Sequence, residues 1–102
     1  MKMSILEYIC FEDYVPSELR RILKNLYFTD YGKETEIEIN DDNTIKCTFI
    51  KSRRYHEATK IENRENIVFK ISKTDGKILS EREEFTSKKL SDREFNKRVI
   101  RI

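Results

Sequence analysis

The sequence is short of the residues that most enzyme motifs need. It has one histidine, His56, and two glycines, Gly32 and Gly76. It therefore holds no His pair and no glycine-rich loop that could cradle a phosphate, and it contains neither G-x-S-x-G nor H-E-x-x-H. A chain of 102 residues also buries only one modest core, which leaves little room for an enclosed active site. We expect a non-enzymatic protein with no catalytic residues, no metal and no cofactor.

Cysteine and long apolar runs are equally scarce. No stretch of about 18 apolar residues exists, and the opening MKMSILEYICF carries Glu7 inside its apolar run, so we expect neither a transmembrane segment nor a signal peptide. Two cysteines are too few for a secreted disulfide framework, which predicts an intracellular protein. Cys10 and Cys47 both fall at core-facing positions of predicted strands. They are either two small core residues or one disulfide of the kind found in hyperthermophiles.

Charge, by contrast, is abundant and unevenly divided. Charged residues make up 39% of the chain and mean hydropathy is −0.75, yet the apolar residues recur periodically, which indicates a folded domain. Residues 1–51 hold 7 Lys and Arg against 10 Asp and Glu, a net charge of −3, and residues 52–102 hold 14 against 9, a net charge of +5. We predict a single domain over 1–102 that comprises two motifs, about 1–51 and 52–102.

A weak internal sequence repeat is the reason for predicting two motifs. ILEYICF followed by Ser17 resembles ILSEREEF followed by Ser91, and two predicted hairpins resemble each other as well. The alternative is that these matches arise by chance, because strands and helix caps use few residue types. KSRRYHE, residues 51–57, then lies at the junction, and we interpret it as an inter-motif connection with a solvated basic surface.

The first two predicted elements are a strand and a helix. Residues 4–11 are apolar on both alternating sets, which is typical of a strand covered on both faces. Residues 17–28 carry leucine and isoleucine at the i, i+3, i+4, i+7 spacing of an amphipathic helix. Ser17 is its expected N-cap, and Gly32 is expected to end it in a left-handed turn.

Two hairpins follow. In residues 35–50 a loop at Asp41–Asn43 pairs Ile39 with Ile45, Ile37 with Cys47 and Glu38 with Lys46, so that apolar and charged residues separate onto two faces. Asn43 tolerates the positive φ that such a loop needs. The Asp75-Gly76 pair predicts the turn of a second hairpin over 66–79.

The last third of the chain holds a segment with mixed strand and helix signals and a segment with a helix signal. Residues 80–86 alternate poorly as a strand, and Ser80 with Glu83 could be a capping box, but we predict an exposed edge strand. Residues 90–102 begin with a Ser91–Glu94 capping box and a Leu90–Phe95 staple, which predict a helix. VIRI, residues 99–102, is expected to leave that helix as a final strand. The fold class is thus α+β, with antiparallel hairpins and two helices.

Two binding functions fit these features. A protein or peptide partner could be bound at an edge strand or at a groove between the motifs, with self-association into a homodimer as one form of it. Nucleic acid is the alternative, bound by the basic stretch 51–56 and the basic C-terminal helix. No membrane partner is expected. The binding candidates are tyrosines, which favour interfaces, and two arginines of the basic stretch: Tyr8, Tyr14, Tyr31, Arg53, Arg54 and Tyr55.

The composition also supports a resemblance. The excess of Ile, Lys, Glu and Arg, the near-absence of Gly, Ala and Gln, and stretches such as LYFTDYGKETEIEIN resemble the small orphan proteins of crenarchaeal filamentous viruses, such as those of Acidianus. The resemblance spans the whole chain, contains no specific motif and transfers no functional residue. It implies a heat-stable protein in the cytoplasm of an infected archaeal host cell.

Overall fold

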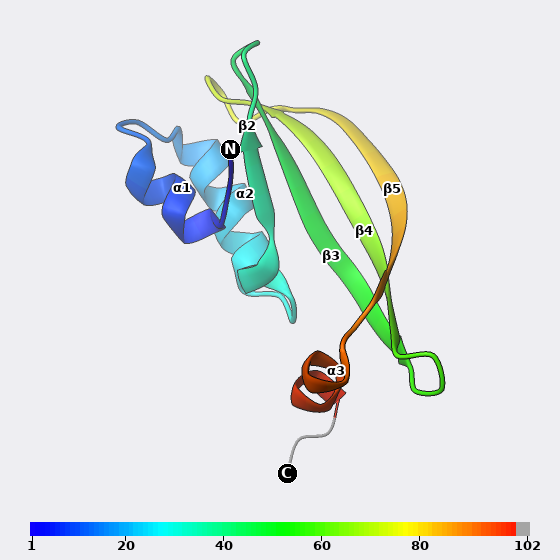
Figure 1. The fold of residues 1–102 in the computed structure, drawn as a ribbon. Helices are drawn as coiled ribbons and strands as arrows, with labels where there is room; N and C mark the ends of the chain where they lie inside the picture. The colour runs from blue at the N-terminus through cyan, green and yellow to red at the C-terminus, as the bar shows by residue number, and fades with distance from the viewer. Residues whose placement is uncertain (100–102) are drawn as a thin grey trace.

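A computed structural model of the chain describes residues 1–99. Two helices stand near the N-terminus, a five-stranded sheet occupies the middle, and a third helix lies at the far end of the sheet (Figure 1). The elements in chain order are β1 (Lys2–Met3), α1 (Ile5–Phe11), α2 (Ser17–Tyr27), the 3₁₀ helix η1 (Gly32–Glu34), β2 (Glu36–Ile39), β3 (Thr44–His56), β4 (Ile61–Ser72), β5 (Ile78–Lys89) and α3 (Asp92–Val99).

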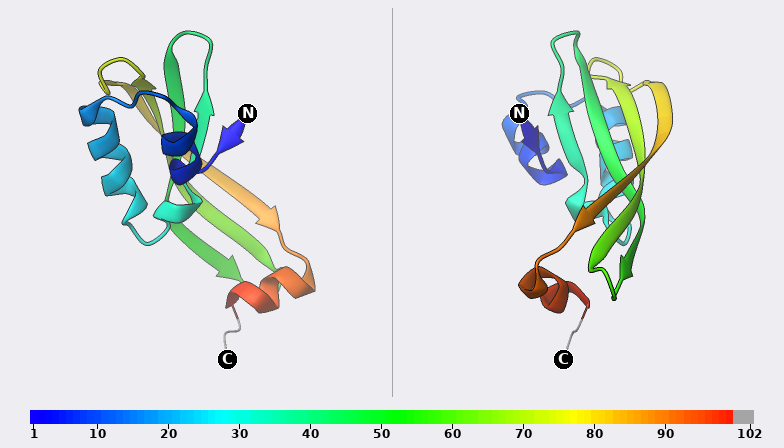
Figure 2. Two further views of the ribbon diagram at one scale, coloured as in Figure 1. Left: turned by 90° about the vertical axis from the view of Figure 1, so that its left-hand side faces the viewer. Right: turned by 45° about the vertical axis from the view of Figure 1, so that its right-hand side comes forward.

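The sheet is antiparallel and its strands follow the order of the chain, β1-β2-β3-β4-β5. The helices α1 and α2 pack against one face of it, while α3 lies at the opposite end (Figure 2). The predicted α+β class with antiparallel hairpins is confirmed, with three α-helices in the described chain where two were predicted.

The β2–β3 hairpin has the predicted register. Ile39 lies opposite Ile45, Ile37 opposite Cys47, and Glu38 opposite Lys46. Asn43 adopts a φ of 63°, as the loop requires. Because side chains alternate between faces, the isoleucines and Cys47 enter the core and the charged residues point to the opposite face.

The β4–β5 hairpin and the edge strand are confirmed as well. Gly76 turns the chain with a φ of 74°, and β5 runs from Ile78 to Lys89 along the edge of the sheet with nearly all of its side chains exposed. β4 begins at Ile61, five residues before the predicted hairpin, and β5 continues three residues past the predicted edge strand. The start of β4 was missed because Glu62–Glu65 are all polar and show no alternation of apolar residues.

The prediction of a strand over residues 4–11 is wrong. These residues form α1, and Ser4 and Glu7 make a complete capping box at its start. Ile5 and Tyr8, one helical turn apart, are buried, whereas Leu6 and Phe11 are 54% and 60% exposed. The apolar run is therefore amphipathic with the period of a helix, and exposed apolar residues hid that period in the sequence.

KSRRYHE is not a connection between motifs. Residues 51–56 continue β3, with a bulge between Ile50 and Ser52, and the chain reverses only after His56 through a turn that places Lys60 at a φ of 55°. The strand β3 thus crosses the expected boundary at 51/52. The two segments of the repeat also differ, since residues 5–11 form a helix and residues 78–85 a strand.

The helix ends agree with the sequence in part. Pro16, not Ser17, is the N-cap of α2, and no side chain caps that helix. At α3 the Ser91 hydroxyl accepts from the Glu94 amide at 3.2 Å, and Leu90 and Phe95 are buried as the staple predicts. Val99 is the last residue of α3, and the rest of the predicted final strand lies outside the described residues.

The hydrophobic core sits between α1, α2 and the first half of the sheet. Its centre consists of Leu19 and Leu23 from α2 against Ile37, Ile45 and Ile71, all 0% exposed. Within residues 1–99 no such layer covers the far half of the sheet. This asymmetry leaves β5 and the ends of β3 and β4 to be held by other interactions.

We predict that Gly32→Ala destabilises the protein by about 2 kcal/mol, as overpacking of a closed site does. Gly32 does not adopt a left-handed conformation, contrary to our expectation. Its requirement is one of space, because an added Cβ would overlap the carbonyl oxygens of Leu26 and Tyr27. Urea denaturation measures the change, with the exposed Lys33→Ala as control. Equal stability of the two variants would contradict this account.

Candidate functional site

The far half of the sheet is held by a buried carboxylate. Glu62 of β4 is 0% exposed, and three arginines surround it. Arg98 of α3 donates from Nη1 to Oε2 at 2.6 Å, Arg64 donates from Nε to Oε1, and the Nε of Arg53 lies 3.8 Å from Oε2. We call these four residues the Glu62 cluster. It connects β3, β4 and α3, which are distant in the sequence.

The strand geometry explains this convergence. Glu62 and Arg64 are two residues apart on β4 and share a face, and Arg53 lies directly opposite Arg64 on β3. Two like charges opposite each other are unfavourable, and the carboxylate of Glu62 between them removes that repulsion. Burial by itself would raise the pKa of Glu62. The guanidinium groups of Arg64, Arg98 and Arg53 outweigh burial and hold the pKa below its ordinary value.

Arg53 extends the cluster to the segment before β2. Its side chain is only 9% exposed, and its Nη2 donates to Glu34 Oε1 at 2.7 Å. The guanidinium carbon lies 5.1 Å from the centre of the Tyr31 ring, within the range of a cation–π contact. Arg53 therefore fastens η1 and Tyr31 to the sheet.

A ring pair fastens α3 on the same side. Tyr55 lies opposite Glu62 on β3, and its ring meets that of Phe95 edge to face, with centroids 6.4 Å apart. Phe95 is 5% exposed and Leu90 2%. The position of α3 thus rests on a small apolar contact together with the ion pair of Arg98.

The structure brings together three of the six residues predicted to bind: Tyr31, Arg53 and Tyr55. Tyr8 is 1% exposed in the core, where burial, assisted by Glu12, raises the pKa of its hydroxyl to about 12, so it offers no binding surface. The others lie apart, with Tyr14 74% exposed between α1 and α2 and Arg54 exposed on the sheet face opposite to that of Arg53.

The disulfide that the sequence left open as an alternative is not formed. Cys10 and Cys47 are both free. Cys47 is buried in β3, and burial raises the pKa of its thiol to about 12. Cys10 is exposed on α1, because the segment that carries it is a helix and not a core strand. The disulfide required Cys10 to face the core from a strand over residues 4–11, and that strand does not exist.

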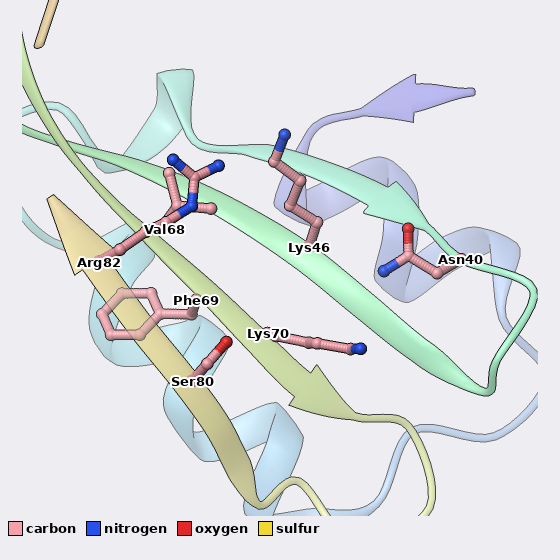
Figure 3. A pocket seen from close by; sticks show the side chains of 7 residues that line it. All are labelled: Asn40, Lys46, Val68, Phe69, Lys70, Ser80 and Arg82. Atoms are coloured by element: carbon pink, nitrogen blue, oxygen red, sulfur yellow. The ribbon is translucent and has the colours of Figure 1, made fainter. Parts of the chain in front are cut away.

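The hollows on the sheet face away from α1 and α2 are polar and open. One of about 190 Å³ has balanced charges, with three cationic and three carboxylate side chains in its lining, Lys2, Lys46, Arg64, Glu34, Glu36 and Glu84. Another, of about 250 Å³, is lined by Lys46, Lys70 and Arg82 among others, and the ammonium ends of the two lysines point apart (Figure 3). Lys70 pairs with Asp42 at 3.0 Å and Arg82 with Glu84 at 3.0 Å, so neither hollow gathers free charge of one sign.

The outer edge of β5 has no strand paired with it in the described chain. The Leu90 amide donates to the Lys60 carbonyl and the Ser72 amide to the Lys77 carbonyl, each across the β4–β5 ladder. Backbone groups alternate in direction along a strand, so even-numbered residues of β5 from 80 to 88 point to β4. The N–H and C=O groups of the odd-numbered residues point outwards: Glu81, Glu83, Phe85, Ser87 and Lys89.

One large side chain stands out at this edge. Phe85 is 73% exposed, compared with 45% for Ile78 and 51% for Leu79 at the start of the same strand. It borders a hollow of about 330 Å³ that also contains Arg54, Asn63 and Ser87. Sequence reasoning predicted the edge strand but not Phe85 or Glu62. A single phenylalanine among charged residues can be buried or exposed, and only the position of its strand in the sheet decides between the two.

Comparison with family models, curated proteins and solved structures finds no match to this chain. Within residues 1–99 no three His, Cys, Asp or Glu side chains are grouped so that they could hold a metal ion. No helix in the same part of the chain has the length and apolar character needed to cross a membrane.

We predict that Glu62→Gln lowers the free energy of unfolding by roughly 3 kcal/mol, as breaking a buried ion pair does. The substitution keeps the shape of the side chain but leaves three arginines without their shared carboxylate. Urea denaturation at pH 7 measures the loss. Glu57→Gln, in the exposed β3–β4 turn, is the control and should change stability by no more than about 0.5 kcal/mol. Equal effects of the two substitutions would show that the cluster is not stabilising.

The stability difference between wild type and Glu62→Gln should shrink as pH falls. A carboxyl whose pKa is lower in the folded state stabilises the fold above its unfolded pKa, about 4.3, and this contribution is lost as pH falls through the lower folded pKa. The other carboxyl groups are common to both proteins and cancel. Unfolding curves at pH 7, 5, 4 and 3 provide the measurement. A difference that stays constant to pH 3 would contradict the assigned direction.

Proposed function

We propose that this chain is a non-catalytic protein-interaction module that binds an extended segment of a partner along the outer edge of β5. The observation that carries the proposal is this edge, which runs in continuous register from Ser80 to Lys89 with no pairing strand beside it in the described chain. An extended segment placed there would satisfy the outward N–H and C=O groups, which provides affinity. Specificity would come from the side chains on either face.

The chemistry of the edge supports selective binding. Folded proteins commonly protect a free edge strand with charged side chains, especially lysine, or with proline, a bulge or a covering element. From Ser80 to Lys89 β5 has no proline and no break in register. Its charges are mixed, with Glu81, Glu83 and Glu84 against Arg82, Lys88 and Lys89. Such a pattern disfavours pairing with an arbitrary strand and favours one of complementary charge.

No specific observation favours the nucleic-acid alternative. Arg53 and Arg54 point to opposite faces of the sheet, and Arg53 is held by Glu34 and Glu62. In the C-terminal helix, Arg98 is bound to Glu62. Cations that already have buried or nearby carboxylate partners are poorly available for phosphates. The alternative therefore rests on the sequence alone.

The proposed setting follows the resemblance stated above. A crenarchaeal virus is the proposed source and the cytoplasm of the infected host cell the proposed location. Only the composition of the chain supports this part of the proposal.

Ser87→Pro tests the proposal. Proline removes an outward N–H that β4 does not use, so the fold should persist while strand addition fails. We predict that the immobilised wild type captures a polypeptide from extract of the source cells, either the same chain or another, and that Ser87→Pro captures at least tenfold less. Ser87→Ala is the matched control, because it also loses the hydroxyl bond to Asn63 but keeps the amide. Capture that is absent, or that Ser87→Pro leaves unchanged, would refute the proposal.

A further inference from the structure

The charges at the end of β5 are complementary to the same sequence read in the opposite direction. Residues 83–89 read Glu-Glu-Phe-Thr-Ser-Lys-Lys, with two acids before Phe85 and two lysines after Ser87, all on the open edge. We infer that the strand bound at this edge is β5 of a second copy of the chain, antiparallel and centred on Thr86. The inference rests on the proposed function and names the partner.

The pairing follows from a twofold axis through Thr86. Antiparallel strands related by such an axis present the same surface to each other, and each contact occurs twice. Glu83 then faces Lys89 of the second copy, Glu84 faces Lys88, and Phe85 faces Ser87. Both acidic residues thus meet lysines directly across the strands, where opposite charges stabilise a sheet.

The backbone groups agree with this arrangement. Glu83, Phe85, Ser87 and Lys89 point their N–H and C=O groups outwards, and the twofold axis pairs these residues only with one another. They therefore occupy hydrogen-bonded positions of the new ladder. Glu84, Thr86 and Lys88 occupy the non-hydrogen-bonded positions, where opposite Cα atoms are about 4.5 Å apart and side chains are closest.

The same arrangement accounts for the exposed phenylalanine. Each Phe85 faces Ser87 of the other copy. The other copy's Phe85 is two residues along the same strand, so the two phenylalanines are diagonal neighbours. Diagonal neighbours are about 7–8 Å apart, which aromatic side chains can span. A ring that is 73% exposed in one chain would pack against its own copy in the dimer.

Other antiparallel registers are less favourable. Hydrogen bonding requires outward residues to face outward residues, so the axis must pass through a residue and not between two. An axis through Phe85 brings Glu81 opposite Lys89 but also sets Arg82 against Lys88. An axis through Glu84 or Glu83 sets that carboxylate against its own copy, and an axis through Ser87 leaves no acid opposite a lysine. Like charges directly opposite destabilise a sheet, which leaves Thr86 as the centre.

Glu84 and Lys88 already form ion pairs within one chain, but these pairs do not prevent them from pairing with a second copy. Glu84 pairs with Arg82 at 3.0 Å, and Lys88 lies 3.9 Å from Glu94. The lysine side chain is 63% exposed, and the Glu84 side chain 34%. Surface pairs of this kind are worth little, so a partner strand can replace them.

Charge reversal tests the inference. The double variant Lys88→Glu/Lys89→Glu makes both ends of the segment acidic, and Glu83→Lys/Glu84→Lys makes both ends basic. Sedimentation velocity over about 1 μM to about 1 mM covers the range in which weak interfaces dissociate. We expect a wild-type dimer, at least tenfold weaker self-association of either variant, and recovery of the dimer in their equimolar mixture. Recovery would also show that both variants are folded.

A cysteine at the centre tests the register. In a Cys10→Ser background, Thr86→Cys should form an intermolecular disulfide on mild oxidation, because its two copies would lie at a Cα separation within the range of disulfides. Arg82→Cys, on the same strand and face, should not, since its two copies would be far apart. Cross-linking of both variants alike, or of Arg82→Cys alone, would overturn the register.

The two proposals can fail separately. A wild type that stays monomeric to about 1 mM, or variants that fail to associate when mixed, would overturn the self-pairing. If Ser87→Pro still abolished capture of a different polypeptide, the proposed function would stand with another partner. If Ser87→Pro left a wild-type dimer intact, dimerisation would proceed through another surface and the self-pairing would be wrong.

Discussion

The far half of this protein depends on one buried carboxylate. Helices α1 and α2 cover only the first half of the sheet, so β3 and β4 extend beyond the hydrophobic core. There, Glu62 gathers Arg53, Arg64 and Arg98 and so links two strands to α3, while Arg53 adds η1 through Glu34. A buried ion network replaces the apolar layer that a sheet of this length would otherwise need.

This constraint has a consequence for the sheet edge. With α3 held by Glu62 and Phe95, the chain leaves β5 at Leu90 and turns back across the end of β4, where the Leu90 amide bonds to Lys60. No described element then returns to cover the outer side of β5. The cluster thus holds α3 at the end of the sheet and leaves the outer edge of β5 open, and the interaction that we propose depends on that edge.

The sequence predicted the elements whose signals are local. The β2–β3 register, the Asp75-Gly76 turn and the Ser91 cap each depend on a few adjacent residues. The prediction failed where contacts between distant parts of the chain decide the structure. Residues 51–57 look like a polar connection because their partners, Glu34, Glu62 and Phe95, lie elsewhere in the sequence. Ser4 and Glu7 did carry a local signal for α1, but the apolar residues on both alternating sets of 4–11 outweighed it.

Amide hydrogen exchange along β5, followed by NMR at low and high protein concentration, tests the central claim most directly. The amides of Glu84, Thr86 and Lys88 bond to β4 and should be protected at every concentration. Those of Glu83, Phe85, Ser87 and Lys89 should exchange freely in dilute solution and become protected as concentration rises. If the outward amides exchange freely at all concentrations, or if all seven are protected alike in dilute solution, β5 is not the self-pairing edge described here.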